Sequence, residues 1–309
     1  METFMKLKQR MRLLKINRTR RKSSRSLAGN IFLGIFLSLI AILFIMPILI
    51  VVNNAFKPMN EMFMFPPKLF VLHPTLNNFF DLFEMASNTL VPFTRYVFNT
   101  VLTVFFGAVG HIVIASMCAF PLAKYKFPGS KFIMNMIIFS LMFSTAVTQV
   151  PNFIIISRLH LLNSYGAIIF PAFGYSLGLY LMKNFMEQIP DALLEAAKID
   201  GSSAFDVLWQ VVMPLVKPAW VTAFILVFQQ LWTNTGSSYI YDESLKGVGY
   251  MLSQLASGGI TSGVRSGLGV ARAGVFSATS LLMFIVPVCV FFITQSNVIS
   301  TMATSGMKE

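Results

Sequence analysis

Residues 195–218 read EAAKIDGSSAFDVLWQVVMPLVKP, and this stretch decides how the rest of the chain is interpreted. It is polar and carries three carboxylates. It lies between two segments, 164–182 and 215–234, that are apolar and long enough to cross a bilayer. The stretch is therefore interpreted as a water-exposed connection between two membrane helices.

Local signals predict two short helices within this connection. Pro190 cannot continue the preceding helix, and Asp191 is a good N-cap for a new one. Residues 192–199 are mostly strong helix formers, and Gly201 stands where such a helix is expected to stop. A second short helix fits residues 203–211 and is ended by the proline that follows it.

The joint between the two helices predicts a compact elbow at Asp200 and Gly201. Ala196 and Ala197 give it a surface of small side chains that another protein can approach closely, while Glu195 offers one charge at its edge. The alternative is a solvated connection that binds no partner. The residues of the elbow alone leave both interpretations open.

The composition of the 309-residue chain indicates a membrane protein before any motif is considered. It is 55% hydrophobic and 12% charged, with a mean hydropathy of +0.70, which is unlike a soluble domain. No Asp, Glu or Arg lies in the segments long enough to span, and Lys217 is their only lysine. We therefore expect an all-α, polytopic membrane protein with six transmembrane helices of about 20 residues or more. The six segments are 31–52, 97–121, 132–156, 164–182, 215–234 and 275–296.

The distribution of charge predicts the orientation of these helices. Residues 1–26 hold ten of the 24 Lys and Arg residues and a single acid. Short basic flanks stay in the cytoplasm, where anionic lipid attracts them. Nucleic acid is not expected as a partner, because aromatic residues are not interleaved with these charges. With six spans, both termini and the loop 183–218 are cytoplasmic, whereas 53–96, 157–163 and 235–274 are outside. The predicted domains are a basic tail (1–30), a transmembrane domain (31–296, core from about 96) and a cytoplasmic C-terminal tail (297–309).

Catalytic and nucleotide-binding motifs are absent from the sequence. It contains no G-x-x-x-x-G-K-[ST] phosphate loop, no HExxH and no Ser-His-Asp constellation. We therefore expect no enzymatic activity, no cofactor and no metal in this chain. Of its three histidines only His111 lies deep in a span, where a hydrogen bond between helices is the common role and proton carriage the rarer one.

Polar residues near the outer end of the fifth span are candidates for a solute pathway. Amides hydrogen-bond sugar hydroxyls, and an aromatic face covers the apolar side of a sugar ring. The alternative is a set of interfacial anchors at a helix end. Tyr175 in the fourth span is a further candidate. The fifth-span candidates are Gln229, Gln230, Trp232 and Asn234.

Three other segments have predicted local features. Pro151 and its polar neighbours predict a kink in the third span. The spacing of Gly174 and Gly178 is typical of a tight helix-packing face. Residues 77–94 fit an amphipathic helix on the outer surface, before the second span.

The stretch 195–218 resembles the Glu-Ala-Ala loop of bacterial ATP-binding-cassette (ABC) importer permeases. Ala197, Gly201 and Pro214 match that pattern, whereas Val211 and Met213 stand in for the usual Ile and Leu. The resemblance covers about residues 30 to 309. Two of its other parts are FNT at 98–100, similar to the family's Asn-Ser entry to the second span, and LAKYKFPG at 122–129, similar to a loop of sugar permeases. The others are NFMEQIP at 184–190, similar to the maltose-transporter type, and residues 294–306, similar to the complex-polysaccharide branch.

The resemblance implies a type I ABC importer permease in the bacterial cell membrane. Its partners would be a homologous second permease, two ATPase subunits that bind ATP and Mg, and an extracytoplasmic binding protein that delivers a sugar or oligosaccharide. The Gly- and Ser-rich segment 257–269 would contact that binding protein. The alternatives are an ion-coupled secondary carrier, which usually needs ionisable residues in its spans, and a permease for a non-sugar solute. The residues implied to couple with the ATPase are Glu195, Ala196, Ala197, Asp200, Gly201 and Pro214.

Overall fold

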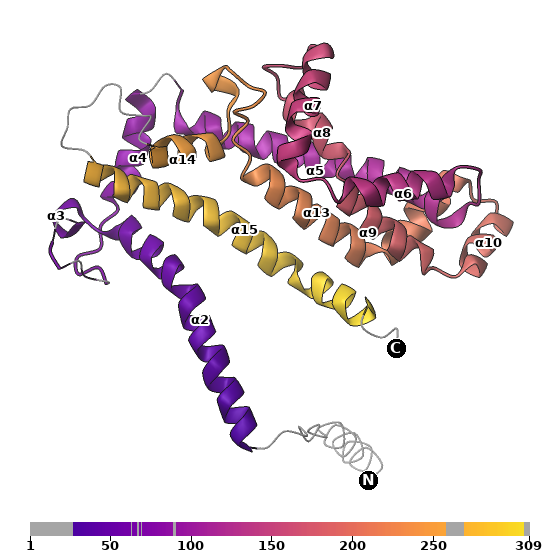
Figure 1. The fold of residues 1–309 in the computed structure, drawn as a ribbon, viewed down its shortest axis with the longest axis horizontal. Coiled ribbons are helices and arrows are strands. Elements are labelled where there is room, and N and C mark those ends of the chain that lie inside the picture. The colour runs from indigo at the N-terminus through magenta and orange to yellow at the C-terminus, as the bar shows by residue number, and fades with distance from the viewer. Residues whose placement is uncertain are drawn as a thin grey trace, which may run out of the picture. The chain divides into compact units, whose positions relative to one another are not determined.

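A computed structural model describes residues 27–62, 64–66, 68, 70–88, 91–257 and 269–305, and every regular element in these ranges is helical (Figure 1). The chain divides into two units, Met1–Ile50 and Val51–Glu309, which are described separately. The basic tail 1–26 and nearly all of the predicted docking segment 257–269 lie outside the described residues.

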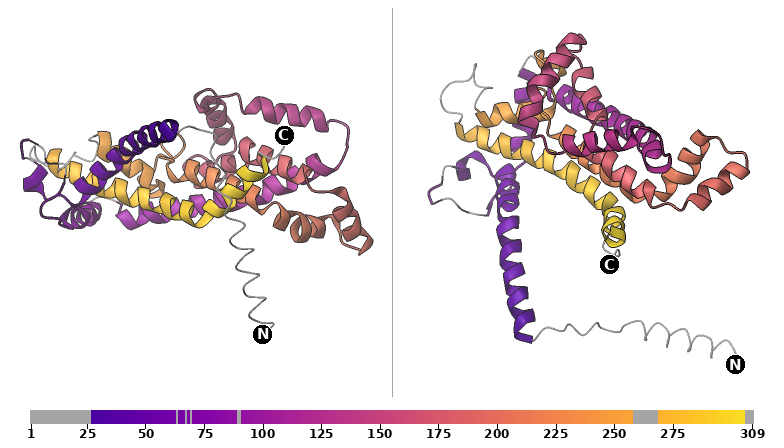
Figure 2. Two further views of the ribbon diagram at one scale, coloured as in Figure 1. Left: turned by 90° about the horizontal axis from the view of Figure 1, so that it is seen from below. Right: turned by 45° about the vertical axis from the view of Figure 1, so that its right-hand side comes forward.

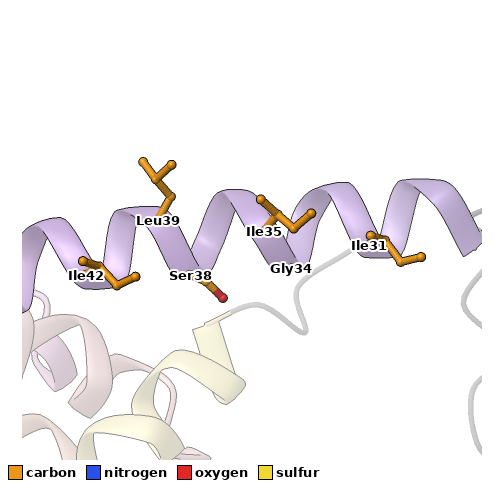
Figure 3. Close-up of a pocket in the computed structure, with 6 residues that line it drawn as sticks. All are labelled: Ile31, Gly34, Ile35, Ser38, Leu39 and Ile42. Atoms are coloured by element: carbon orange, nitrogen blue, oxygen red, sulfur yellow. The ribbon is translucent and has the colours of Figure 1, made fainter.

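The first unit contains most of helix α2 (Leu27–Phe56). Residues 30–39 and 41–50 of this helix are exposed on the chain, and nearly all are apolar. A shallow hollow on its surface is lined by one helix alone, through Ile31, Gly34, Ile35, Ser38, Leu39 and Ile42 (Figure 3). A helix that is apolar all round is typical of a membrane span, in agreement with the segment predicted at 31–52.

The second unit is built around α5 (Phe93–Lys124), which packs against α8 (Gly166–Phe173), α9 (Ser176–Glu187) and α13 (Lys217–Trp232). Helix α13 also packs against α15 (Gly269–Ser305), and Figures 1 and 2 show these helices side by side. The remaining helices are α3 (Met59–Met62), α4 (Asn77–Asn88), α6 (Ser130–Ser140), α7 (Thr145–Arg158), α10 (Asp191–Ile199), α11 (Ala204–Asp206), the π-helix η1 (Val207–Val212), α12 (Met213–Leu215), the 3-10 helix η2 (Glu243–Leu245) and α14 (Val248–Ser257).

Fewer helices than predicted are long and apolar enough to span a membrane by themselves. In the described residues these are Gly29–Phe56, Phe93–Lys124 and Ala273–Gln295, which match the predicted first, second and sixth spans. The predicted fifth span brings the number of candidate spans in the described residues to four if Ala204–Leu215 and Lys217–Trp232, which meet at an 83° bend, are counted as one span.

The predicted third and fourth spans are each divided into two shorter helices. The break in the third lies at 141–144, between α6 and α7, and not at Pro151, which is inside α7. Ser144, in extended conformation, is the N-cap of α7, and serine favours that position over a helix interior. The break in the fourth falls at Gly174 and Tyr175.

Gly174 and Gly178 do not share the packing role that their spacing predicted. A Cβ at Gly178 would lie 2.2 Å from His111 Nε2, so this glycine admits a ring from α5. A Cβ at Gly174 would meet only a carbonyl oxygen at 3.7 Å. His111 is fully buried, and its Nδ1 lies 3.1 Å from the Phe173 carbonyl at the α8–α9 break. The predicted hydrogen bond between helices is therefore confirmed.

The buried apolar residues form two main clusters along the bundle. One surrounds α13 and the first half of α5 and includes Val227, Leu231 and Ile240. The other joins the second half of α5 to α9 and η1, through side chains such as Met182 and Val212. The second cluster fixes the base of the elbow at Asp200 and Gly201, through Leu194 on one arm and Val207 on the other.

Candidate functional site

Helix α10 begins at Asp191, the residue that was predicted to be its N-cap and therefore to precede its first turn. Pro190 is the N-cap, with φ −59° and ψ 133° and without a side-chain capping bond, and Asp191 is the first helical residue. The Asp191 carboxylate is instead an acceptor for Lys124 Nζ at 2.8 Å. This hydrogen bond with Lys124 lowers the pKa of Asp191 below its usual value. The predicted N-cap role of Asp191 is wrong, because a cation distant in sequence takes its carboxylate.

The end of α10 has the backbone geometry of a Schellman motif. The Gly201 N–H donates to the Lys198 carbonyl and the Ser202 N–H to the Ala197 carbonyl, both at 3.0 Å. Gly201 has φ +84°, in the left-handed region that favours glycine. A Cβ at this position would meet nothing within 4 Å. The glycine is therefore required for the backbone conformation of the turn and not for clearance inside this chain.

The second arm of the elbow starts at a capping box. Ser203 Oγ accepts from the Asp206 N–H, and the Asp206 carboxylate accepts from the Ser203 N–H, each at 3.2 Å. The predicted helix at 203–211 is correct at its start but wrong at its end, because helical turns continue through η1 to Leu215.

The direction of the chain changes at Val216, two residues after Pro214. Neither Pro214 nor Pro218 has an N–H, so the carbonyls four residues before them lose their usual helical donors. The helix up to Leu215 and α13 consequently meet at the 83° bend. Pro214 thus contributes to a bend between two helices and does not stop the first one.

The two arms of the elbow hold one face in the core and present the other to solvent. Leu194 of α10 and Val207 of η1 are buried in the same apolar cluster. Glu195 and Ala196 are exposed, and the described residues give Glu195 no ion-pair partner. Because its buried face is anchored, α10 is held as a firm surface patch (Figure 1, at the end of the second unit opposite α4 and α14).

Large apolar side chains are exposed on both arms of the elbow, and the two most exposed were not identified as functional from the sequence. Ile199 is 86% exposed and Phe205 is 59% exposed. An isolated Ile or Phe within a polar connection is the signal that identifies them. Exposed apolar side chains beside small residues and one free carboxylate form a surface suited to contact with another protein.

The candidate pathway residues at the end of α13 are not equivalent. Trp232 is 8% exposed, and its indole N–H donates to the Met283 carbonyl of α15 at 2.9 Å. That carbonyl lacks its helical donor because residue 287 is proline. Trp232 therefore joins α13 to α15.

The other candidates have different surroundings. Gln229 and Gln230 are exposed on the chain. Asn234 is half-buried and accepts from the Gly236 N–H at 2.8 Å. Tyr175 is half-buried with its ring edge-on to His111. The two glutamines are thus the members of the set whose amides face away from the core.

A polar cluster in the first turns of α5 involves Asn99 and Thr100, which the resemblance matches at the start of the second span, but the partners of these side chains were not predicted. Asn99 is buried, and its amide donates to the carbonyls of Ser244 and Lys246, both at 2.8 Å. Its oxygen accepts from the Tyr165 hydroxyl at 2.8 Å. The Thr100 hydroxyl accepts from the Val248 N–H at 2.8 Å. These bonds fix the segment 244–248 to the first turns of α5.

Comparison with known proteins places this architecture in one family. Residues 111–298 match the family described as "Binding-protein-dependent transport system inner membrane component". A probable ABC transporter permease protein of Pyrococcus horikoshii is 25% identical over 236 residues, covering 75% of this chain and 82% of that protein. The polygalacturonan/rhamnogalacturonan transport system permease of Bacillus subtilis is 27% identical over 241 residues, covering 77% and 81%. The sn-glycerol-3-phosphate transport system permease of Yersinia enterocolitica is 28% identical over 210 residues, covering 68% and 73%.

Solved structures share the fold. A bacterial ABC transporter involved in the import of the acidic polysaccharide alginate superposes with a TM-score of 0.77 at 20% identity, covering 89% of this chain and 99% of that chain. A bacterial alginate ABC transporter in complex with an alginate pentasaccharide-bound periplasmic protein gives 0.58 at 13% identity, covering 86% and 92%. The family match includes the whole elbow and more than half of the sequence. The chain therefore belongs to the family of binding-protein-dependent transport system inner membrane components.

Proposed function

We propose that this chain is a permease subunit of an ATP-driven importer that takes up a saccharide delivered by an extracytoplasmic binding protein. The observation that carries the proposal is the elbow of α10 and α11, which is anchored on one face and presents small, apolar and acidic side chains on the other. Family membership supports it, and so do relatives whose names specify transport of polygalacturonan and rhamnogalacturonan. An ion-coupled carrier is not favoured by this family, and the predicted spans contain no Asp or Glu.

The elbow docks on an ATPase subunit and receives its motion. Ala196, Ala197 and Gly201 permit close approach, and Glu195 faces a basic residue of the docking groove. Asp200 is part of the same coupling region, as the last residue before the turn. Pro214 is part of it through the bend that leads into α13. ATP and Mg are bound by the partner, because this sequence has no phosphate loop.

The assembly contains this chain, a homologous second permease, two ATPase subunits and the binding protein. The chain crosses the bacterial cytoplasmic membrane six times with both termini inside, so the broken helices α6–α7 and α8–α9 each count as one span. Breaks within a span are tolerated where neighbouring protein or a water-filled pathway satisfies the freed backbone groups.

The solute pathway passes the end of α13. Gln229 and Gln230 are exposed there, and each amide offers donors and an acceptor for sugar hydroxyls. Asn234 and Tyr175 are half-buried and contribute to the wall of this pathway behind the two glutamines. Trp232 contributes by holding α13 against α15.

Reconstitution tests this function directly. The permease is co-expressed with its sister permease and ATPase, purified, inserted into vesicles and supplied with the binding protein and candidate solutes. We expect ATP-dependent uptake of a saccharide that co-purifies with the binding protein. Uptake of glycerol 3-phosphate in place of any saccharide would reassign the solute, and uptake without the ATPase would refute the importer.

A further inference from the structure

A single buried lysine holds together three elements at the base of the elbow. Lys124 is the last residue of α5, and its side chain is 6% exposed. Its ammonium donates to the Asp191 carboxylate at 2.8 Å, to the Ile189 carbonyl, and more weakly to the Glu187 carbonyl at 3.5 Å. These acceptors belong to the end of α9, the joint that follows it and the start of α10.

The two carbonyl acceptors, of Glu187 and Ile189, lie where α9 ends and its helical hydrogen bonds stop. The last carbonyls of a helix have no partner within it, and the negative end of the helix dipole attracts a cation. Pro190 has no N–H, and the carboxylate of Asp191 adds a charge at the next residue. Lys124 therefore supplies a donor to the carbonyls at the end of α9 and a counter-charge to the Asp191 carboxylate at the start of α10.

A second contact attaches α10 to the same end of α5. Lys198 Nζ lies 5.4 Å from the centre of the Tyr125 ring, one residue beyond Lys124. Lys124, Lys198 and Glu195 line a common cavity of about 170 Å³ between the end of α5 and α10. The elbow is thus joined to α5 at its first turn by Lys124 and at its last turn by Tyr125.

We propose that Lys124 is a positioning residue that fastens α10 to α5, so that displacement of α10 by the ATPase moves α5 and is not absorbed at the α9–α10 joint. The inference rests on the proposed function and extends it to a residue outside the docking face. Helix α5 is 32 residues long, and Asn99 and Thr100 tie its other end to the segment 244–248. Motion of α5 therefore reaches the far end of the bundle.

The test compares Lys124→Met with Lys124→Arg and with a matched control, Lys183→Met. Lys183 has a side chain that is 14% exposed, and it forms an ion pair with Glu187 inside α9 alone. Four quantities are measured on the purified complex: retained ATPase subunit, basal ATP hydrolysis, stimulation of hydrolysis by loaded binding protein, and uptake in vesicles.

For Lys124→Met we expect full retention of the ATPase with stimulation and uptake lowered by about tenfold or more, as follows from losing the hydrogen bonds of a charged side chain that is itself buried. Lys124→Arg should recover most of both, and Lys183→Met should behave as the unmodified protein. If Lys124→Met prevents assembly, Asp191→Asn takes its place, because that exposed carboxylate is the one charged acceptor. It should lower stimulation in the same sense but less.

Two results overturn the inference. One is normal stimulation and uptake in both Lys124→Met and Asp191→Asn. The other is loss of uptake only in proportion to the amount of assembled complex, which would make Lys124 a stabilising residue without a role in coupling. A wild-type permease that retains no ATPase at all would instead refute the proposed function itself.

Discussion

Replacement of Gly201 tests whether the shape of the elbow determines ATPase binding. The turn places this residue at φ +84°, and a side chain in the left-handed region costs about 1–2 kcal/mol. Nothing lies within 4 Å of a Cβ built there, so no steric cost inside the chain is added. If this strain opens the turn, the ratio of closed to open elbow falls by a factor of about 5–30.

The affinity for the ATPase should fall by up to the same factor, because a partner that binds only the closed elbow binds only the closed fraction of the permease. Gly201→Ala should show the full effect. Gly201→Asn should show less, since Asn tolerates this conformation better. Gly201→Asp should be worse than Asn, because it adds a negative charge at a helix C-terminus.

The chain supplies a matched control in Gly129. It has φ +91°, a Cβ there would also meet nothing within 4 Å, and it caps α6 outside the elbow. Binding of the purified ATPase is titrated for each variant in detergent, alongside the thermal unfolding temperature. Gly129→Ala should carry a similar strain without losing ATPase affinity. Equal losses for Gly129→Ala and Gly201→Ala would refute the reasoning, and equal losses for Ala and Asn at 201 would indicate a clash with the ATPase in place of backbone strain.

Two further predictions concern packing inside the bundle. Trp232→Phe should cost about 1–3 kcal/mol of stability, because the buried Met283 carbonyl loses its donor. Adding Pro287→Ala to this variant should recover part of the loss by restoring an N–H. A double variant that melts no higher than Trp232→Phe alone would contradict the assignment. Gly178→Ala should destabilise the chain by about 1–3 kcal/mol, because its methyl group would collide with the His111 ring. Gly174→Ala should be tolerated. Equal melting temperatures for the two variants would count against this packing.

The sequence predicts those features that depend on near neighbours along the chain. Gly201 was recognised as the end of α10 because strong helix formers precede it, and the structure confirms the turn. Asp191 was assigned the wrong role because its partner, Lys124, lies 67 residues away. The spacing of Gly174 and Gly178 predicts the same packing role for both, and only the position of His111 shows that Gly178 alone has it.

The interior of the spans was less predictable for the same reason. The third span breaks at 141–144 although Pro151 is its strongest local signal. Trp232 was placed among pathway candidates because amides surround it in sequence, whereas its indole donates to a carbonyl that a proline on another helix leaves without a donor. Hydrophobicity predicts that a segment is buried in membrane or protein, but it does not predict which side chains of other helices contact that segment.

Cross-linking from the elbow tests the central claim most directly. With Cys118 and Cys289 replaced by serine, a single cysteine is placed at Ala196, on the exposed face of α10, or at Ser253, which is exposed on α14 and predicted to lie outside. The assembled complex is treated with a short bifunctional thiol reagent and probed for the ATPase subunit. We expect a permease–ATPase product from position 196 that ATP binding alters, and no such product from position 253. A complex that transports its solute yet gives no ATPase product from position 196 would contradict this expectation.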